Sequence, residues 1–357
     1  MSASPPLVLT SDPLLLDELN RLAAAAGVEP DRGRDAADAR RRWSSAPLIL
    51  VGRDLAPELA ASSPQRRDGV VLVSRDLDDV DVWALGVALS VEAVVFLPDA
   101  QAWLVDRLAD SADGPAPEAT TIAVLGGSGG AGATVLACAL AVTGVRRGLR
   151  TLLVDGDPLG GGIDLTVGGE DSDGLRWPDL ASARGRVNGA ALRDILPRVH
   201  DLTVLSWDRG DMLSIPVDAM RSVLAGARRS SDLVVVDLPR RLDDAAAEAL
   251  SIARPALLVV PAEIRATAAA ARVAAAATLV SSDLRLVVRG PAPSGLDAEL
   301  MAESLGLPLE GSLRAEPGLA GALERGVPPA SRGRGPLAGF CADFLDRRAP
   351  RSSHAAA

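Results

Sequence analysis

Leu125-Gly126-Gly127-Ser128-Gly129-Gly130-Ala131-Gly132-Ala133-Thr134 is the stretch that decides the fold of the larger part of this sequence. The apolar run before it, residues 121–125, predicts a buried parallel strand, and residues 135–145 behind it predict a helix. A glycine-rich loop between a strand and a helix directs backbone N–H groups and the positive helix end at an anion. We therefore expect a phosphate-binding loop here, and we call residues 127–132 the glycine loop.

The glycine loop lacks the cation that nucleotide-binding loops normally carry. Such loops use a lysine that reaches the β- and γ-phosphates and a Ser or Thr hydroxyl for Mg²⁺. Thr134 supplies the hydroxyl, but the lysine position is Ala133. All 37 basic residues of the chain are arginines, so a compositional bias explains the general absence of lysine. Because that bias does not explain why a nucleotide hydrolase would tolerate the loss here, we treat Ala133 as functionally informative.

The bulk composition indicates a soluble globular protein with two domains. A length of 357 residues exceeds the roughly 100–200 residues of one domain. No apolar run approaches the roughly 18 residues of a membrane span, and the N-terminus lacks the basic region of a signal peptide, so we expect a cytoplasmic protein. A net charge of −10 and an aromatic content of 2% argue against a general affinity for nucleic acid.

The cysteines and histidines do not form a metal or disulfide pattern. Cys138 and Cys341 share no ligand spacing, and we expect both to be small core residues. His200 is expected to flank a strand, and His354 lies in the C-terminal tail.

The N-terminal part alternates short apolar runs with helical patterns. This five-unit pattern predicts a parallel sheet with helices on both faces over residues 1–110. The expected strands are residues 7–10, a short one near 28, 48–51, 70–73 and 93–97, and the expected helices include 14–26, 55–61, 80–89 and 101–109. In size and order this part resembles the receiver domain of response regulators (CheY-like).

The resemblance to receiver domains fails at their chemistry. The phosphoacceptor position at the end of the third strand is Gly52, and the lysine expected after the fifth strand falls at Leu97-Pro98. Asp12 alone remains of the acidic pocket. Asp54 lies close by in the sequence, but we interpret it as a solvated carboxylate at a helix start. We therefore expect a pseudo-receiver that serves docking or dimerisation.

The remaining boundaries follow from composition. Residues 111–119 are small and contain Pro and Gly without apolar periodicity, which predicts an interdomain linker. The second domain is expected to cover residues 120–348 and to be doubly wound, and residues 349–357 are expected to be a disordered tail.

Three further segments place carboxylates at strand ends. A strand over residues 151–154 leads into Asp155 and Asp157, and a strand over 233–236 leads into Asp237. The strand over 256–261 emerges into a loop at Glu263. Because ligands of doubly wound sheets bind at the carboxyl edge of the strands, these residues are expected to meet the glycine loop there.

Together these motifs resemble the MinD/ParA group of deviant P-loop ATPases over residues 120–348. The carriers of the resemblance are the strand, glycine loop and helix, the Asp-x-Asp-Pro of residues 155–158, the Asp-Leu-Pro of 237–239 and the Val-Pro-Ala-Glu of 260–263. The pseudo-receiver in front and the Val-Asp-Leu-Pro-Arg of 236–240 are most similar to the CpaE/TadZ branch. The run 153–165 is similar to actinobacterial CpaE-like proteins described as septum site-determining.

The resemblance implies roles for particular residues. Asp157 would orient the attacking water, Thr134 would bind Mg²⁺, and Asp237 would support the metal. The residues that would surround the nucleotide are Gly127, Ser128, Gly129, Gly130, Ala131, Gly132, Ala133, Thr134, Val135 and Asp155. The alternative for the glycines is a tight turn without a ligand.

The sequence departs from this family at both lysines. Ser128 stands where the family has the lysine that reaches the partner subunit's nucleotide, and Ala133 where it has the cradle lysine. The resemblance therefore implies weak binding of ATP and Mg²⁺, with hydrolysis weak or absent. Arginines near the site are expected to be surface charges: Arg209, Arg240, Arg241 and Arg265.

The resulting hypothesis is a spatial regulator of cell division or of Tad pilus and secretion machinery positioning. Its partners would be cell-division or pilus and secretion proteins, a homodimer stays open, and the protein could be recruited to the septum or pole. Membrane contact would be peripheral at most, because we expect the helix over 337–348 to pack on the sheet. Two alternatives stay open: a slow ATP-driven switch, and a nucleoid-binding ParA-like module.

Overall fold

A computed structural model describes residues 4–112, 119–182, 189–292 and 295–348 of the chain. The chain divides into two compact units, residues 1–117 and 118–357, and each is described by itself. Residues 113–118 of the expected linker and the expected tail at 349–357 lie outside the described residues.

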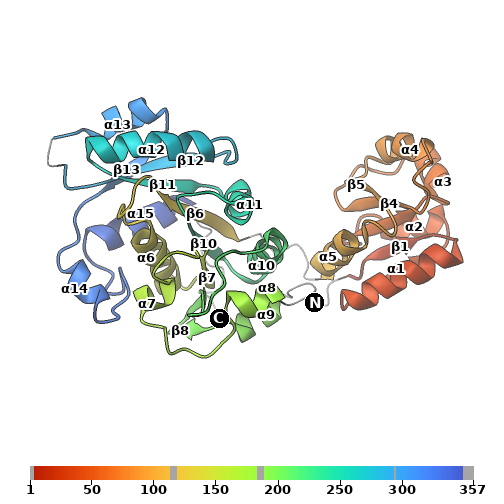
Figure 1. Ribbon diagram of the computed structural model, residues 1–357. Coiled ribbons are helices and arrows are strands. Elements are labelled where there is room, and N and C mark those ends of the chain that lie inside the picture. Colours follow the sequence, from red (N-terminus) through yellow and green to blue (C-terminus); the bar gives the residue numbers. More distant parts are fainter. Residues whose placement is uncertain (1–3, 113–118, 183–188, 293–294, 349–357) are drawn as a thin grey trace. The chain divides into compact units, whose positions relative to one another are not determined.

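The first unit is a five-stranded parallel sheet with helices on both faces (Figure 1). Its strand order is β2-β1-β3-β4-β5, so the chain reverses its direction of winding once. The strands are β1 (Leu7–Leu9), β2 (Asp31–Gly33), β3 (Ile49–Gly52), β4 (Val70–Ser74) and β5 (Ala93–Phe96); the helices are α1 (Pro13–Ala25), α2 (Ala36–Arg42), α3 (Ala56–Ala61), α4 (Asp81–Leu89) and α5 (Gln101–Ala112).

Side chains point alternately to the two faces of the sheet along each strand, and this forms two cores in this unit. Leu7 and Leu9 of β1 face α2, α3 and α4, whereas Val8 faces α1 and α5. Successive strand residues point to opposite faces of a sheet, so a strand that is buried on both faces must be apolar throughout. This explains why β1 and β3 are continuous runs without polar side chains, why β4 is apolar up to its last residue, Ser74, and why every residue of the three strands is buried.

Two expectations for this unit need correction. The second strand is Asp31–Gly33 and not a strand near residue 28, because Gly27 adopts φ +71° and Val28 still donates to the carbonyl of Ala23 at the end of α1. Helix α5 continues to Ala112, so residues 111 and 112, expected in the linker, are helical. Ser111 is buried and its hydroxyl donates to the carbonyl of Leu108.

The second unit is built on an eight-stranded sheet with the order β13-β12-β11-β6-β10-β7-β9-β8. All pairs are parallel except β8 with β9. The strands are β6 (Thr120–Gly126), β7 (Thr151–Asp155), β8 (Arg198–Val199), β9 (Leu202–Leu205), β10 (Leu233–Leu238), β11 (Ala256–Pro261), β12 (Leu284–Arg289) and β13 (Leu309–Leu313); the helices are α6 (Ala133–Arg146), α7 (Ile163–Val167), α8 (Trp177–Ser182), α9 (Gly189–Ile195), α10 (Val217–Ser230), α11 (Asp244–Ile252), α12 (Ile264–Ala277), α13 (Ala298–Leu305), α14 (Leu319–Leu323) and α15 (Pro336–Arg348).

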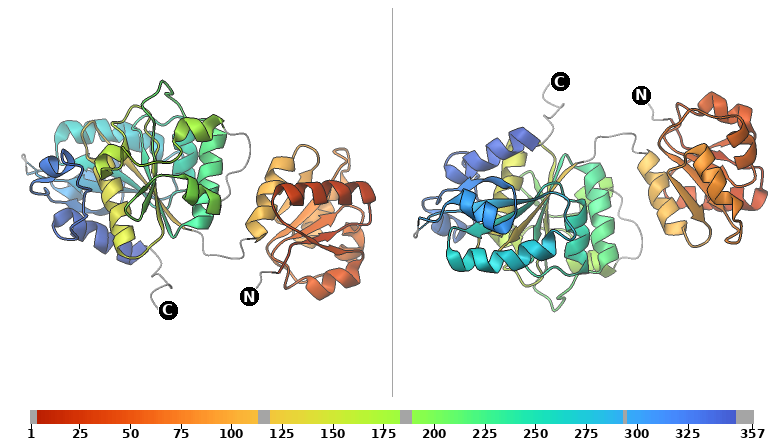
Figure 2. Two further views of the ribbon diagram at one scale, coloured as in Figure 1. Left: turned by 90° about the horizontal axis from the view of Figure 1, so that it is seen from below. Right: turned by 90° about the horizontal axis from the view of Figure 1, so that it is seen from above.

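Helices cover both faces of this sheet, as Figures 1 and 2 show. One core packs side chains from α8 to α13 against the sheet, and the other packs α6, α7 and α15 against the opposite face. Strand β6 lies between β11 and β10, so the glycine loop that follows it leaves from the middle of the carboxyl edge. This topology is the doubly wound α/β fold expected from the sequence.

The last helix belongs to the core. In α15 the buried side chains include Leu337, Phe344 and Leu345, which pack in the same cluster as Leu140 of α6. Cys341 is buried and unpaired, as is Cys138 of α6. The apolar face of α15 is thus occupied by protein. Among the described residues, no helix combines the length and the apolar character needed to span a bilayer.

Candidate functional site

The glycine loop joins β6 to α6 with two residues in the left-handed region. Gly130 has φ +68° and Gly132 has φ +91°, a conformation that residues with a Cβ adopt only at a cost in energy. Gly127 at the start of the loop donates its N–H to the carbonyl of Val259 in β11 at 2.8 Å. The loop is thus fixed at its base, and it delivers the chain to the first turn of α6, where unpaired backbone N–H groups favour an anion.

A close approach of α12 explains why residue 127 of the loop is a glycine. A methyl group on Gly127 would lie 2.6 Å from the Cβ of Ala270 and 2.8 Å from a methyl of Val260. Only a residue without a Cβ fits at this contact. Gly129 is different, because a methyl group there would meet nothing closer than 3.9 Å.

Thr134 and Asp237 are brought together at the carboxyl edge. The Thr134 hydroxyl in the first turn of α6 lies beside the carboxyl group of Asp237, the last residue but one of β10. Burial raises the pKa of Asp237 from 3.8 to about 8, the hydrogen bond from Thr134 opposes this rise, and the nearby carboxylates of Asp155 and Asp157 add to it. A cation at this edge would relieve the same repulsion.

Asp155 lies at the end of β7 and is almost fully buried, with 1% of its surface exposed. Burial raises its pKa from 3.8 to about 6, although hydrogen bonds from the Ile163 N–H and the Ser206 hydroxyl, both at 3.0 Å, favour the charged form. The indole N–H of Trp177 donates to the Asp155 carbonyl at 2.6 Å. These hydrogen bonds fix Asp155 at the carboxyl end of β7.

Asp157 lies two residues beyond the end of β7 and is half-buried. Its carboxylate accepts the N–H of Leu159 at 3.0 Å, and its own N–H donates to Asp155 at 3.2 Å. The Gly156 N–H donates to the Asp237 carbonyl at 2.7 Å, which ties the ends of β7 and β10 together. The structure thus gathers the three carboxylates and Thr134 at the glycine loop.

The residues present fit a Mg²⁺ ion that is held mainly by a phosphate ligand and water. Mg²⁺ prefers oxygen ligands and usually takes only one or two from the protein beside substrate phosphates. Thr134 and Asp237 supply such oxygens. Within the described ranges, no group of three or more His, Cys, Asp or Glu side chains is arranged to hold a metal by itself.

The two positions without lysine are at the loop itself. Ser128 and Ala133 are both half-buried, and Ala133 packs at the border of the α6 core. Gly129 and Gly130 between them are exposed. The backbone cradle is therefore present, but the loop contributes no side-chain cation to it.

Ser206 and Trp177 both donate hydrogen bonds to Asp155, and neither was expected at the site from the sequence. Neither stands at a fixed spacing from the glycine loop, so no motif marks them. Arg209, expected as a surface charge, pairs with the buried Asp164 at 3.2 Å, although 54% of its own side chain is exposed.

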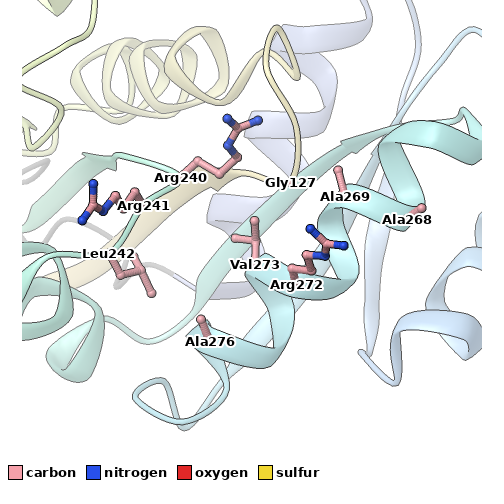
Figure 3. A pocket seen from close by; sticks show the side chains of 9 residues that line it. All are labelled: Gly127, Arg240, Arg241, Leu242, Ala268, Ala269, Arg272, Val273 and Ala276. Atoms are coloured by element: carbon pink, nitrogen blue, oxygen red, sulfur yellow. The ribbon is translucent and has the colours of Figure 1, made fainter.

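An arginine-rimmed pocket adjoins the glycine loop (Figure 3). Its volume is about 630 Å³, and it lies between the segment after β10 and the outer side of α12. The residues that line it are Gly127, Arg240, Arg241, Leu242, Ala268, Ala269, Arg272, Val273 and Ala276. Arg240, Arg241 and Arg272 are exposed, and none of them forms an ion pair with a residue that the structure describes. Arg265, the remaining arginine considered from the sequence, is exposed near the start of α12.

In the first unit, the carboxylate of Asp54 fills the space above Gly52. A methyl group on Gly52 would lie 2.4 Å from Asp54 Oδ1. Asp54 accepts the hydroxyl of Thr10 at 2.7 Å and both the N–H and the hydroxyl of Ser11 at 2.6 Å. Partial burial raises the pKa of Asp54, but these hydrogen bonds outweigh it and leave the pKa below its ordinary value. Asp12 caps α1 through the Leu14 N–H.

The comparison of sequences relates about nine tenths of the chain to a mycobacterial protein. Residues 9–119 match the family model described as "Rv3660c-like, CheY-like N-terminal domain". Protein Rv3660c of Mycobacterium tuberculosis is 41% identical over 325 residues, which cover 89% of this chain and 91% of that protein. A putative septum site-determining protein MinD of Oltmannsiellopsis viridis is 26% identical over 239 residues, covering 64% of this chain and 74% of its own.

Solved structures share the fold of the second unit. A ParA family ATPase from Chlorobium tepidum has a TM-score of 0.57 at 15% identity, covering 64% of this chain and 98% of that one. A chain of the MinC:MinD cell division protein complex from Aquifex aeolicus has a TM-score of 0.53 at 21% identity, covering 65% of this chain and 98% of that one. The septum site-determining protein MinD complexed with Mg-ADP from Pyrococcus horikoshii has a TM-score of 0.54 at 18% identity, covering 64% of this chain and 95% of that one. With a CheY-like unit followed by a MinD/ParA-like P-loop unit, and with 41% identity over nine tenths of the sequence, this chain belongs to the Rv3660c-like family.

Proposed function

We propose that this protein is a spatial regulator of cell division or of Tad pilus and secretion machinery positioning. Its second unit binds ATP with Mg²⁺ weakly and hydrolyses it slowly or not at all. The observation that carries this proposal is the combination at the glycine loop: the backbone cradle and the Thr134–Asp237 pair are present, whereas Ser128 and Ala133 replace both lysines.

The ligand would be held by backbone groups rather than by side-chain charge. The N–H groups of the glycine loop and of the first turn of α6 would bind the phosphates. Mg²⁺, when bound, neutralises phosphate charge, and Thr134 and Asp237 are the residues that would hold it. Asp155 keeps the end of β7 in place, and Asp157 lies where it can orient a water molecule.

The magnitude of the missing contacts explains why binding should be weak. A charge-assisted hydrogen bond contributes roughly 1.5–3 kcal/mol, so two missing lysines cost about 3–6 kcal/mol of binding free energy. This corresponds to a loss of affinity on the order of 10²- to 10⁴-fold. The effect on hydrolysis is larger, since one cationic group at the transferred phosphate is typically worth about 10³–10⁵ in rate.

The proposed role in positioning is supported by the names of the proteins that this chain matches. The matched proteins include a septum site-determining MinD, a MinC:MinD cell division complex and a ParA family ATPase. A CheY-like unit in front of such a domain is the arrangement of the CpaE/TadZ branch, which the sequence resembles. We infer that the first unit docks partner proteins, because Gly52 replaces the phosphoacceptor and Asp54 is occupied by Thr10 and Ser11.

A titration of the full-length protein with fluorescently labelled ATP, with and without Mg²⁺, tests nucleotide binding. We expect weak binding that strengthens with Mg²⁺. Thr134→Val is the matched variant, since it keeps the size of the side chain and removes the hydroxyl; it should abolish the Mg²⁺ effect. A wild-type protein that shows no binding at millimolar ATP would overturn the proposed ligand. A fluorescent fusion in the native host, which should concentrate at the septum or pole, tests the cellular role.

A further inference from the structure

We propose that Arg240 and Arg289 supply, from outside the glycine loop, the positive charge that its two missing lysines leave out. The loop would then take a polyphosphate group between two guanidinium groups. This inference rests on the proposed binding of a nucleotide, and it names the residues that would bind the phosphates in place of the lysines.

Arg240 lies beside the exposed end of the glycine loop. It follows β10 by two residues, after Pro239. Its Nη1 would be 3.9 Å from a methyl group placed on Gly129, the residue after the lysine position Ser128. Figure 3 shows the Arg240 side chain extending along the loop, whereas Arg241 points away from it. Arg240 has no ion-pair partner among the described residues, so its charge is available to a ligand.

Arg289 lies against the other end of the loop. It is the last residue of β12, and a methyl group on Gly132 would be 3.4 Å from its Cδ and 3.9 Å from its Nε. The Arg289 side chain is half-buried, and its Nε is buried without a hydrogen-bond partner among the residues described. A buried donor without a partner costs roughly 1–3 kcal/mol. An anion in the loop would satisfy such a donor.

The strand order explains how both arginines reach one loop. Strand β10 is a direct neighbour of β6 on one side, and β12 lies beyond β11 on the other side. Since all four strands are parallel, their carboxyl ends lie at one edge, and the residues that follow them flank the loop from opposite sides. A guanidinium group matches phosphate better than an ammonium group does, because its planar fork donates two parallel hydrogen bonds.

The pocket provides its own control residues. Arg241 and Arg272 line the same pocket as Arg240 and are also exposed. Neither side chain provides one of the nearest atoms to a methyl group placed on a glycine of the loop. A change of either removes the same charge from the same surface, so a general electrostatic effect would appear in all three variants, whereas a phosphate contact would appear only in Arg240.

The experiment measures binding of labelled ATP to the full chain, with competition by inorganic tripolyphosphate. We expect Arg240→Gln and Arg289→Gln each to weaken both ligands about 10- to 100-fold, the loss of one charge-assisted contact. Arg241→Gln and Arg272→Gln should change affinity by no more than about twofold, as expected for a screened surface charge. Arg240→Lys should restore part of the loss. Thermal unfolding of each variant reports whether the fold is retained.

The outcomes separate this inference from the proposed function. If the wild-type protein binds ATP but Arg240→Gln and Arg289→Gln bind it equally well, the assignment of the arginines is wrong and the proposed function stands. If the wild-type protein binds neither ATP nor tripolyphosphate, both are wrong. Equal losses in the Arg240 and Arg241 variants would also overturn the assignment. Should Arg289→Gln unfold, Arg240→Gln decides the question, because that side chain is exposed.

Discussion

The Thr134 hydroxyl lies beside the carboxyl group of Asp237, where the first turn of α6 meets the end of β10. This contact joins the glycine loop to the carboxylates of the sheet edge, which are otherwise on separate strands. The loop itself carries Ser128 and Ala133 where related loops carry lysines. Three carboxyl groups thus lie close together at this edge, and the loop contributes no side-chain cation to offset their charge when they ionise.

The first prediction is that ATP turnover is very slow or absent. Ser128 and Ala133 remove the two lysines that, in related loops, offset the charge developing on the γ-phosphate, and we assign Arg240 and Arg289 to binding of the polyphosphate group and not to this step. A release assay for inorganic phosphate should give a rate close to the uncatalysed background. The double variant Ser128→Lys with Ala133→Lys should raise the rate, since the backbone cradle and Thr134 are already in place.

Robust ATPase activity in the wild-type protein that disappears in Asp157→Ala would contradict this prediction. It would favour the interpretation of the protein as a slow ATP-driven switch.

The second prediction concerns pH and Asp237 in metal-free buffer. The folded protein keeps a proton on Asp237 up to about pH 8, whereas the unfolded chain releases it near 3.8. The free energy of unfolding therefore falls as the pH rises through this window. The raised pKa of Asp155 makes the free energy of unfolding depend on pH only below about pH 6. Above pH 6 the dependence comes mainly from Asp237. Between about pH 6 and pH 9 we expect a loss of roughly 1–3 kcal/mol.

Urea unfolding of the wild-type protein and of Asp237→Asn at both pH values measures this effect. The variant keeps an oxygen that can accept the Thr134 hydroxyl but cannot ionise, so its stability should change less over the same range. The same pH dependence in the variant and in the wild type would rule out Asp237 as the cause.

The third prediction compares two glycines of one loop. Gly127→Ala puts a methyl group 2.6 Å from Ala270, so α12 or the loop must move, and we expect a destabilisation of roughly 1–3 kcal/mol. Gly129→Ala meets nothing within 3.9 Å and does not require a left-handed backbone, so its stability should be nearly unchanged. Equal unfolding midpoints for the two variants would show that α12 does not pack against the loop as described.

The fold of both units could be predicted from the sequence because the strands are apolar runs of the right length. The expected doubly wound sheets with helices on both faces are confirmed. The strands over 151–155, 233–238 and 256–261 are buried at every residue, which leaves a continuous apolar signal. Strand β2, with the sequence Asp-Arg-Gly, carries no such signal, so the prediction of a strand near residue 28 was wrong.

The surroundings of the site could be predicted only in part. A glycine loop and strand-end carboxylates are local patterns, so the sequence marks Thr134, Asp155 and Asp237 directly. The positions of Arg240 and Arg289 beside the loop depend on which strands are neighbours, and the strand order is not written in any spacing. The same holds for Ser206, which reaches Asp155 over 51 residues of sequence.

The fourth prediction is that the first unit does not accept phosphate. Gly52 has no carboxylate, and the space above it is taken by Asp54, whose oxygens already accept hydrogen bonds from Thr10 and Ser11. Treatment with acetyl phosphate followed by intact-mass measurement should show no stable addition. A phosphate that maps to Asp12 or Asp54 would refute the prediction and would make this unit a genuine receiver.

The last prediction is that any self-association of the protein is insensitive to ATP. The sandwich dimer implied by the resemblance depends on a lysine that crosses to the partner's phosphates, and this chain has Ser128 there. Arg240 lies beside its own loop, so the charge that we assign to it acts within one chain and gives the nucleotide little preference for dimer over monomer. Sedimentation equilibrium with and without saturating Mg·ATP should give the same association constant. A shift from monomer to dimer on adding ATP would contradict this and would indicate that an arginine reaches the partner's nucleotide; Arg240→Gln, which should then abolish the shift, identifies that arginine.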